Sequence, residues 1–365
     1  MEKFDIETPA PLVDRMKMER NIRRMVEVAQ GAGLRLRPHT KTHKCPAIAK
    51  IQIRLGAQGI AVAKIGEAEA MADAGLDDIL VAYPIVGEKK LTRLLDLNER
   101  IRAACTTDSY EVAAGLSAAA QARRQTVHLF VEVDSGMGRV GLPPCEPVLE
   151  LVRRIADLPG IHFTGLLTHG GMDRHVTNAG DLPGLALQES EDCLTTAALL
   201  RDNGFPVKEI SVGSTPLARF GGAPGVTELR PGTFVFFDVS MVSLGAATID
   251  DCAYTVLTTV VCRHPDRLVI DAGSKTLSND RPAGQLYTTG LGVVVGHPHL
   301  KVARLSEDHG VLTIDGEGPL PKIGEKIEIV PNHVCQSVNL HDTLNVVVGT
   351  EVVDAWRVEG RGKTV

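Results

Sequence analysis

Aromatic side chains are scarce in this chain of 365 residues, of which only 4% are Phe, Tyr or Trp. The core must therefore be built mainly from Val, Ile, Leu and Ala, and hydrophobic residues make up 44% of the chain. Glycine is plentiful, with 36 residues, which indicates many backbone turns. This composition is typical of an α/β protein, and the length suits one large domain followed by a smaller one.

Clusters of one charge and long apolar runs are also missing. No run of Lys and Arg is long enough to indicate binding to nucleic acid or to a membrane surface, and the net charge is −6. The first residues lack the apolar stretch of a signal peptide, and no segment approaches the ~20 apolar residues of a membrane span. The seven cysteines, an odd number, are scattered, so no disulfide framework is expected. We therefore expect a cytoplasmic protein with neither a nucleic-acid nor a membrane partner.

Helical and strand-like patterns alternate over the first two-thirds of the chain, which predicts a parallel sheet. The number and length of these βα units match a (β/α)8 barrel, or TIM barrel, better than an open sheet. Residues 10–237 are assigned to this barrel. The predicted strands are 34–39, 59–63, 78–84, 101–105, 126–134, 162–169, 208–213 and 226–232.

The pattern changes after about residue 237. Short β-runs separated by turn residues fill the remainder, which predicts a C-terminal all-β domain over residues 238–365. Residues 1–9 are expected to pack with this second domain.

Four polar residues fall just past predicted strand ends, where barrels place their catalytic groups. They are Lys41, Arg139, His169 and Ser214. Lys41 stands between His39 and His43, and a lysine whose pKa is lowered by burial and cationic neighbours suits Schiff-base chemistry. A solvated surface lysine is the alternative, and the motif alone is weak.

Two further turns have ligand-binding character. Arg139 lies in a glycine-rich turn, where its guanidinium could hold an anionic ring oxygen or a carboxylate; the alternative is a surface ion pair. Gly213, Ser214 and Thr215 follow a late strand, where backbone N–H groups and hydroxyls often bind phosphate. A plain turn is an equally good interpretation of that segment on its own.

His333 and Cys335 form a His-x-Cys pair in the segment 331–342. If the segment is a β-strand, both side chains point to the same face and can bind one metal. Imidazole plus thiolate favours zinc. From two ligands alone, however, a buried cysteine beside a core histidine is the better interpretation.

Taken together, these segments resemble the family of D-serine dehydratases and D-threonine aldolases. The family joins an alanine-racemase-like barrel, which binds pyridoxal 5'-phosphate (PLP), to a β-domain. The similarity covers most of the chain and includes RPHTKTHK, VEVDSGMGRVG, the THGG loop, GSTP, TELRPGTFVFFD and PNHVCQSVNLHD, all in one order.

The resemblance implies a role for each candidate. Lys41 would bind PLP covalently, Arg139 would contact its phenolic oxygen, and His333 and Cys335 would hold a divalent metal, with zinc expected and manganese or magnesium as alternatives. The phosphate would be held by Gly213, Ser214 and Thr215. Family members usually form homodimers and act on small D-amino acids.

The same resemblance leaves two reaction types open. Aldolases of the family carry aspartate in place of Cys335 and tend to have glutamine at Ala63, so both positions favour the dehydratase type, which converts a β-hydroxy D-amino acid to a keto acid and ammonia. His169 and His175 favour the aldolase type, because retro-aldol cleavage to glycine and an aldehyde needs a base for the β-hydroxyl. A racemase would leave the His-x-Cys pair unexplained. A non-catalytic PLP carrier ranks last, because such one-domain carriers lack a β-domain.

Overall fold

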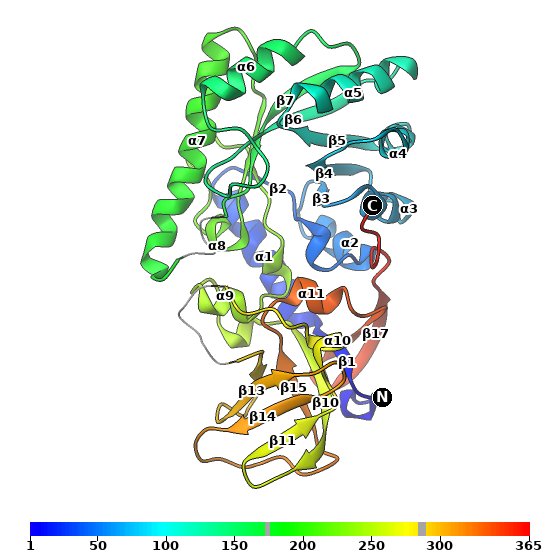
Figure 1. The fold of residues 1–365 in the computed structure, drawn as a ribbon, viewed down its shortest axis with the longest axis vertical. Coiled ribbons are helices and arrows are strands. Elements are labelled where there is room, and N and C mark those ends of the chain that lie inside the picture. The colour runs from blue at the N-terminus through cyan, green and yellow to red at the C-terminus, as the bar shows by residue number, and fades with distance from the viewer. Residues whose placement is uncertain (172–175, 284–289) are drawn as a thin grey trace.

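The computed structural model describes residues 1–171, 176–283 and 290–365. These residues fold around two β-sheets, and Figure 1 shows one sheet with its helices above the other. No helix in these ranges is both long and apolar enough to cross a membrane.

The first sheet is the predicted barrel. Its eight strands in the described ranges are all parallel and run in the order β2-β9-β8-β7-β6-β5-β4-β3. A bridge between His39 and Ala61 joins the two outer strands and closes the ring. The bounds are β2 (Arg35–Leu36), β3 (Ile60–Val62), β4 (Asp78–Pro84), β5 (Arg102–Thr107), β6 (Val127–Val133), β7 (Ile161–Thr168), β8 (Glu209–Val212) and β9 (Glu228–Leu229).

Helices cover the outside of this ring (Figure 1). The first, α1 (Arg15–Gly31), begins at Asp14, whose carboxylate accepts a hydrogen bond from the Lys17 N–H at 3.0 Å. Its buried residues recur at helical spacing and include Met18, Ile22, Met25 and Ala29. The others are α2 (Pro46–Arg54), α3 (Ile65–Asp73), α4 (Glu88–Asn98), α5 (Tyr110–Ala122), α6 (Glu146–Ile155), α7 (Leu182–Asp202) and α8 (Thr215–Ala218).

The second sheet follows the order β11-β14-β13-β12-β15-β10-β1-β16-β17, and β10 also pairs with β11. Three short helices accompany it, namely α9 (Val239–Ser243), α10 (Ser274–Leu277) and α11 (Val334–Val338). Its strands are β1 (Ala10–Asp14), β10 (Tyr254–Arg263), β11 (Arg267–Ile270), β12 (Val293–Val294), β13 (Leu300–Leu305), β14 (Gly310–Ile314), β15 (Lys326–Val330), β16 (Thr343–Val348) and β17 (Glu351–Arg357).

Strand β1 differs from the expected domain boundary. Residues 10–14 were assigned to the barrel, yet β1 pairs antiparallel with β10 and parallel with β16 in the second sheet. The partner strands lie more than 200 residues away along the chain, so local sequence patterns cannot reveal this pairing. Residue 10 is therefore not the start of the barrel in the structure.

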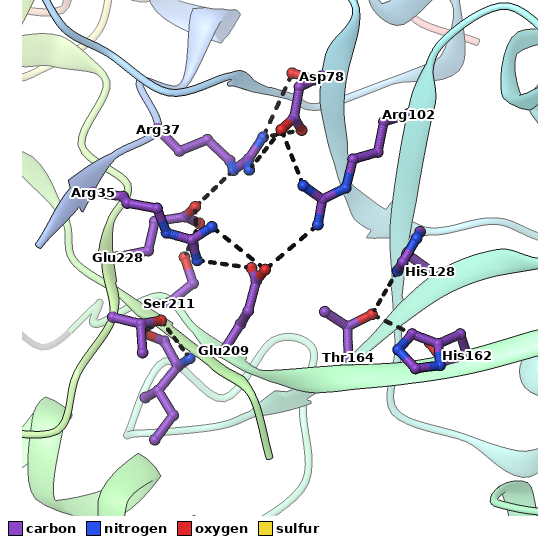
Figure 2. A network of polar contacts seen from close by, with 12 residues as sticks. Arg35, Arg37, Asp78, Arg102, His128, His162, Thr164, Glu209, Ser211 and Glu228 are labelled. Atoms are coloured by element: carbon purple, nitrogen blue, oxygen red, sulfur yellow. Dashed lines mark hydrogen bonds and ion pairs between the residues drawn. The ribbon is translucent and has the colours of Figure 1, made fainter. Parts of the chain in front are cut away.

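A network of charged side chains fills the end of the barrel where the strands begin (Figure 2). Arg37 is 5% exposed and donates from Nε to Glu228 Oε2 at 2.9 Å, and Glu228 is fully buried. Arg37 Nη1 also donates to Asp78 Oδ1 at 2.7 Å. This end of a barrel serves stability rather than catalysis, and the network matches that role.

Replacing Glu228 with glutamine should destabilise the protein strongly. The buried Arg37 guanidinium would lose its fully buried counter-charge, and breaking such a pair costs about 3–5 kcal/mol in the free energy of unfolding. Arg102→Gln is the matched control, because Arg102 is 48% exposed and its ion pairs in the same network should contribute at most about 1 kcal/mol. Urea unfolding of the two variants measures both values. Equal losses in the free energy of unfolding would show that the buried ion pair stabilises the protein no more than the exposed ion pairs do.

Candidate active site

A cavity of about 670 Å³ opens at the other end of the barrel, between the carboxyl ends of the strands and the second sheet's short helices. It gathers most of the residues singled out from the sequence. Lys41, Arg139, His169, Ser214, Thr215, His333 and Cys335 all line it. His175 lies outside the described residues.

Lys41 lies in the single 3₁₀ turn η2 (Thr40–Thr42) that follows β2. The preceding His39 ring accepts a hydrogen bond on Nδ1 from the Lys41 backbone N–H at 3.3 Å. Burial lowers the pKa of His39 well below its usual value, and the nearby positive charges of Lys41 and Arg230 lower it further. His39 is therefore a neutral ring that fixes the backbone of the turn carrying Lys41.

The turn that carries Arg139 is shaped by Asp134 and the glycines. The Asp134 carboxylate accepts hydrogen bonds from the N–H groups of Gly136 and Gly138 at 3.0 to 3.1 Å. Gly141 has φ +112°, and a Cβ there would lie 2.7 Å from the Asp134 backbone nitrogen. Only glycine fits at that point. Gly141 therefore lets the backbone turn back against Asp134, and Arg139 lies in this turn at the cavity wall.

The GSTP segment places two of its three predicted residues at the cavity. Ser214 is the N-cap residue of α8 and Thr215 is its first residue. The Thr215 hydroxyl oxygen accepts a hydrogen bond from the Phe234 N–H at 3.1 Å, which leaves its O–H to donate. Gly213 differs from the prediction, because its N–H donates to Glu189 Oε1 at 3.2 Å inside the protein. With φ +111°, Gly213 turns the chain into α8 rather than offering a donor to the cavity.

Arg230 is a site residue that sequence reasoning missed. It follows β9, lines the cavity and is 4% exposed, and its Nη2 donates to the Thr168 carbonyl. Its buried Nε has no hydrogen-bond partner among the described residues. Burial lowers the pKa of Arg230, an effect opposed by the carboxylates of Glu132 and Glu228. The sequence could have indicated Arg230, because this residue follows a strand end within TELRPG, as Lys41 does within RPHTKTHK.

The His333–Cys335 pair is brought to the cavity, but not by a β-strand. Cys335 lies in the short helix α11, and His333 is its N-cap residue. The two side chains nevertheless contact each other. Burial opposes the charged His333 ring, yet the hydrogen bond and charge of Cys335 outweigh it and raise the pKa of His333 to about 9. In the same way, burial disfavours the Cys335 thiolate, but His333 lowers the pKa of Cys335 below its usual value.

Asp280 is a second residue that sequence reasoning missed. His333 Nδ1 lies 2.7 Å from Asp280 Oδ2, and Cys335 Sγ lies 3.3 Å from Thr42 Oγ1, next to Lys41. A carboxylate on one ring nitrogen orients a histidine so that its other nitrogen can bind a metal. No set of three or more His, Cys, Asp and Glu side chains gathers as a metal site in the described ranges. The role of His333 and Cys335 as metal ligands therefore stays a prediction.

Comparison with known proteins covers nearly the whole chain. Residues 13–240 match the alanine racemase N-terminal domain family, and residues 253–347 match a putative serine dehydratase domain. The chain is 32% identical to a D-threonine aldolase of Arthrobacter sp., over 98% of this chain and 93% of that protein. It is also 32% identical to a D-threo-3-hydroxyaspartate dehydratase of Delftia sp., over 96% of this chain and 97% of that protein.

Solved structures named D-threo-3-hydroxyaspartate dehydratase are similar too. A Cys→Ala variant in the metal-free form superposes with a TM-score of 0.91 at 30% identity, covering 98% of each chain. A second solved variant with that name replaces a histidine whose residue number is two lower than that of the cysteine. The spacing is that of His333 and Cys335.

Proposed function

The chain belongs to the family of D-serine dehydratases and D-threonine aldolases, and from this we propose that it is a PLP- and metal-dependent lyase of β-hydroxy D-amino acids, of the dehydratase type. One observation carries the proposal. A single cavity holds Lys41 at a strand end, Arg230 with an unpaired buried Nε, and the His333–Cys335 pair.

The barrel side of the cavity suits PLP. Lys41 supplies the amine, and Arg139 supplies a cation for the phenolic oxygen. The unpaired Arg230 Nε would donate to the ring nitrogen, and the Ser214 and Thr215 hydroxyls would hold the phosphate. When bound, PLP supplies an electron sink for a carbanion at the substrate Cα.

The opposite wall suits a divalent metal. His333 and Cys335 would hold it, and imidazole plus thiolate favours zinc over manganese or magnesium. The metal supplies Lewis-acid assistance at the β-hydroxyl. Two protein ligands leave open coordination positions for water and substrate, as a catalytic site requires and a structural site does not.

The chain's own residues then divide the remaining work. The Lys41 amine takes the α-proton in the elimination. Asp280 keeps the His333 ring in place through the 2.7 Å hydrogen bond, and the buried, neutral His39 keeps Lys41 in place.

The dehydratase type is favoured by two positions. Cys335 stands where aldolases of the family carry aspartate, and Ala63, where they tend to have glutamine, lines the cavity and so can influence the substrate directly. The aldolase type is the second candidate, because His169 also lines the cavity and could take a β-hydroxyl proton. The homodimer and the cytoplasmic location stay predictions.

Analysis of the products distinguishes the two types. The purified protein, loaded with PLP and zinc, is incubated with D-serine, D-threonine and D-threo-3-hydroxyaspartate. Elimination gives pyruvate, 2-oxobutyrate or oxaloacetate with ammonia, as we expect. Glycine and an aldehyde as the main products would show that the aldolase type is correct.

A further inference from the structure

Arg281 lines the cavity directly after Asp280, the residue that is hydrogen-bonded to His333. The backbone is anchored on both sides of it. The Asp280 carbonyl accepts from Asn332 Nδ2 at 2.9 Å, and the Ala283 N–H donates to Ser240 Oγ at 3.0 Å. Arg281 is therefore held on the metal side of the cavity rather than on the phosphate side.

Two lysines that line the cavity already have partners. Lys44 Nζ lies 3.1 Å from Glu67 Oε1, and Lys64 Nζ lies 3.5 Å from the centre of the Tyr83 ring. Arg281, by contrast, is exposed and forms no ion pair with any residue of 1–171, 176–283 or 290–365. Its guanidinium is a fork of N–H donors that can bind a carboxylate through two parallel hydrogen bonds.

We propose that Arg281 binds a carboxylate on the β-carbon of the substrate, so that the preferred class is β-hydroxy D-amino acids with an acidic side chain. The inference rests on the proposed function, because a metal at His333 and Cys335 draws the β-hydroxyl, and with it the β-substituent, to this wall. The methyl group of D-threonine and the hydrogen of D-serine offer Arg281 no acceptor. A carboxylate on the β-carbon, as in 3-hydroxyaspartate, offers Arg281 such an acceptor.

The test compares kcat/KM of the PLP- and metal-loaded protein for D-threo-3-hydroxyaspartate, D-threonine and D-serine. Arg281→Met should lower the value for the dicarboxylate about 10- to 150-fold, the range for a lost charge-assisted hydrogen bond, and leave the two neutral substrates unchanged. Arg281→Lys should recover part of the loss, since lysine keeps the charge without the fork. Arg304→Met, at an exposed position of β13, is the control and should change none of the three.

A binding measurement adds a second readout. D-Aspartate and D-alanine differ by the β-carboxylate and carry no β-hydroxyl, so their dissociation constants report recognition without elimination. Arg281→Met should weaken D-aspartate alone. An equal loss for acidic and neutral ligands, or no loss for either, would overturn the role of Arg281. A wild-type protein that turns over none of the three β-hydroxy substrates yet binds D-aspartate through Arg281 would instead contradict the proposed function.

Discussion

Lys41→Ala should abolish covalent PLP binding and lower kcat by more than about 10³-fold, because the variant loses both the amine that holds PLP and the base for the α-proton. The position of Lys41 supports this expectation. Lys41 lies in the turn after β2 at the cavity, with its backbone fixed by His39. Borohydride reduction followed by peptide mass spectrometry locates the attached PLP, and a steady-state assay measures kcat.

Lys50→Ala is the matched control for this experiment. Lys50 lies nearby in α2 but is exposed, so its variant should keep PLP and full activity. If reduced PLP is found on another lysine of the wild-type protein, or if Lys41→Ala keeps its visible absorption band, the assignment of Lys41 is wrong.

Removing the metal should lower turnover more than about 100-fold while PLP stays bound and the protein stays folded, because Lewis-acid stabilisation contributes several kcal/mol at the β-hydroxyl. Exchange of the α-proton with solvent should survive, since that step needs only Lys41 and PLP. After chelation, elemental analysis measures the remaining metal, the assay measures turnover, and thermal unfolding shows whether the protein stays folded.

Cys335→Asp should keep some activity and accept manganese better, because a carboxylate is a harder ligand than a thiolate.

The chain offers a second Cys–His pair as a control. Cys262 Sγ lies 3.2 Å from His264 Nε2, with the same spacing in sequence, but neither residue lines the cavity. Cys262→Ala should leave metal content and activity unchanged, whereas Cys335→Ala should lose both. A similar metal loss in the two variants would place the metal elsewhere.

The strand-end candidates could be predicted because their placement follows from topology. In a parallel barrel the carboxyl ends of all strands meet on one side, so Lys41, Arg139, His169 and Ser214 had to converge once the alternation of helices and strands was recognised. The structure brings all four to one cavity. Their individual roles stay predictions, because position alone does not fix a chemical step.

Features that depend on distant residues could not be predicted. The start of the short helix after His333 is held by a distant residue, because the Asp238 carboxylate accepts a hydrogen bond from the Val334 N–H at 2.9 Å, a contact across almost a hundred residues. The Asp280–His333 hydrogen bond is likewise non-local. In both cases the local pattern of apolar and polar residues carries no information about the partner, so the sequence could not show that the His-x-Cys pair lies at a short helix rather than on a β-strand.

The most direct test of the whole account is the consumption of matched D- and L-β-hydroxy amino acids by one protein preparation, with and without zinc. The loaded protein should consume D-serine, D-threonine or D-threo-3-hydroxyaspartate and leave the L-enantiomers intact, and chelation should stop the reaction until zinc is restored. Chiral chromatography measures the remaining substrate. Equal consumption of both enantiomers, or full turnover of the D-forms by protein shown to be metal-free, would contradict a metal-dependent D-amino-acid lyase.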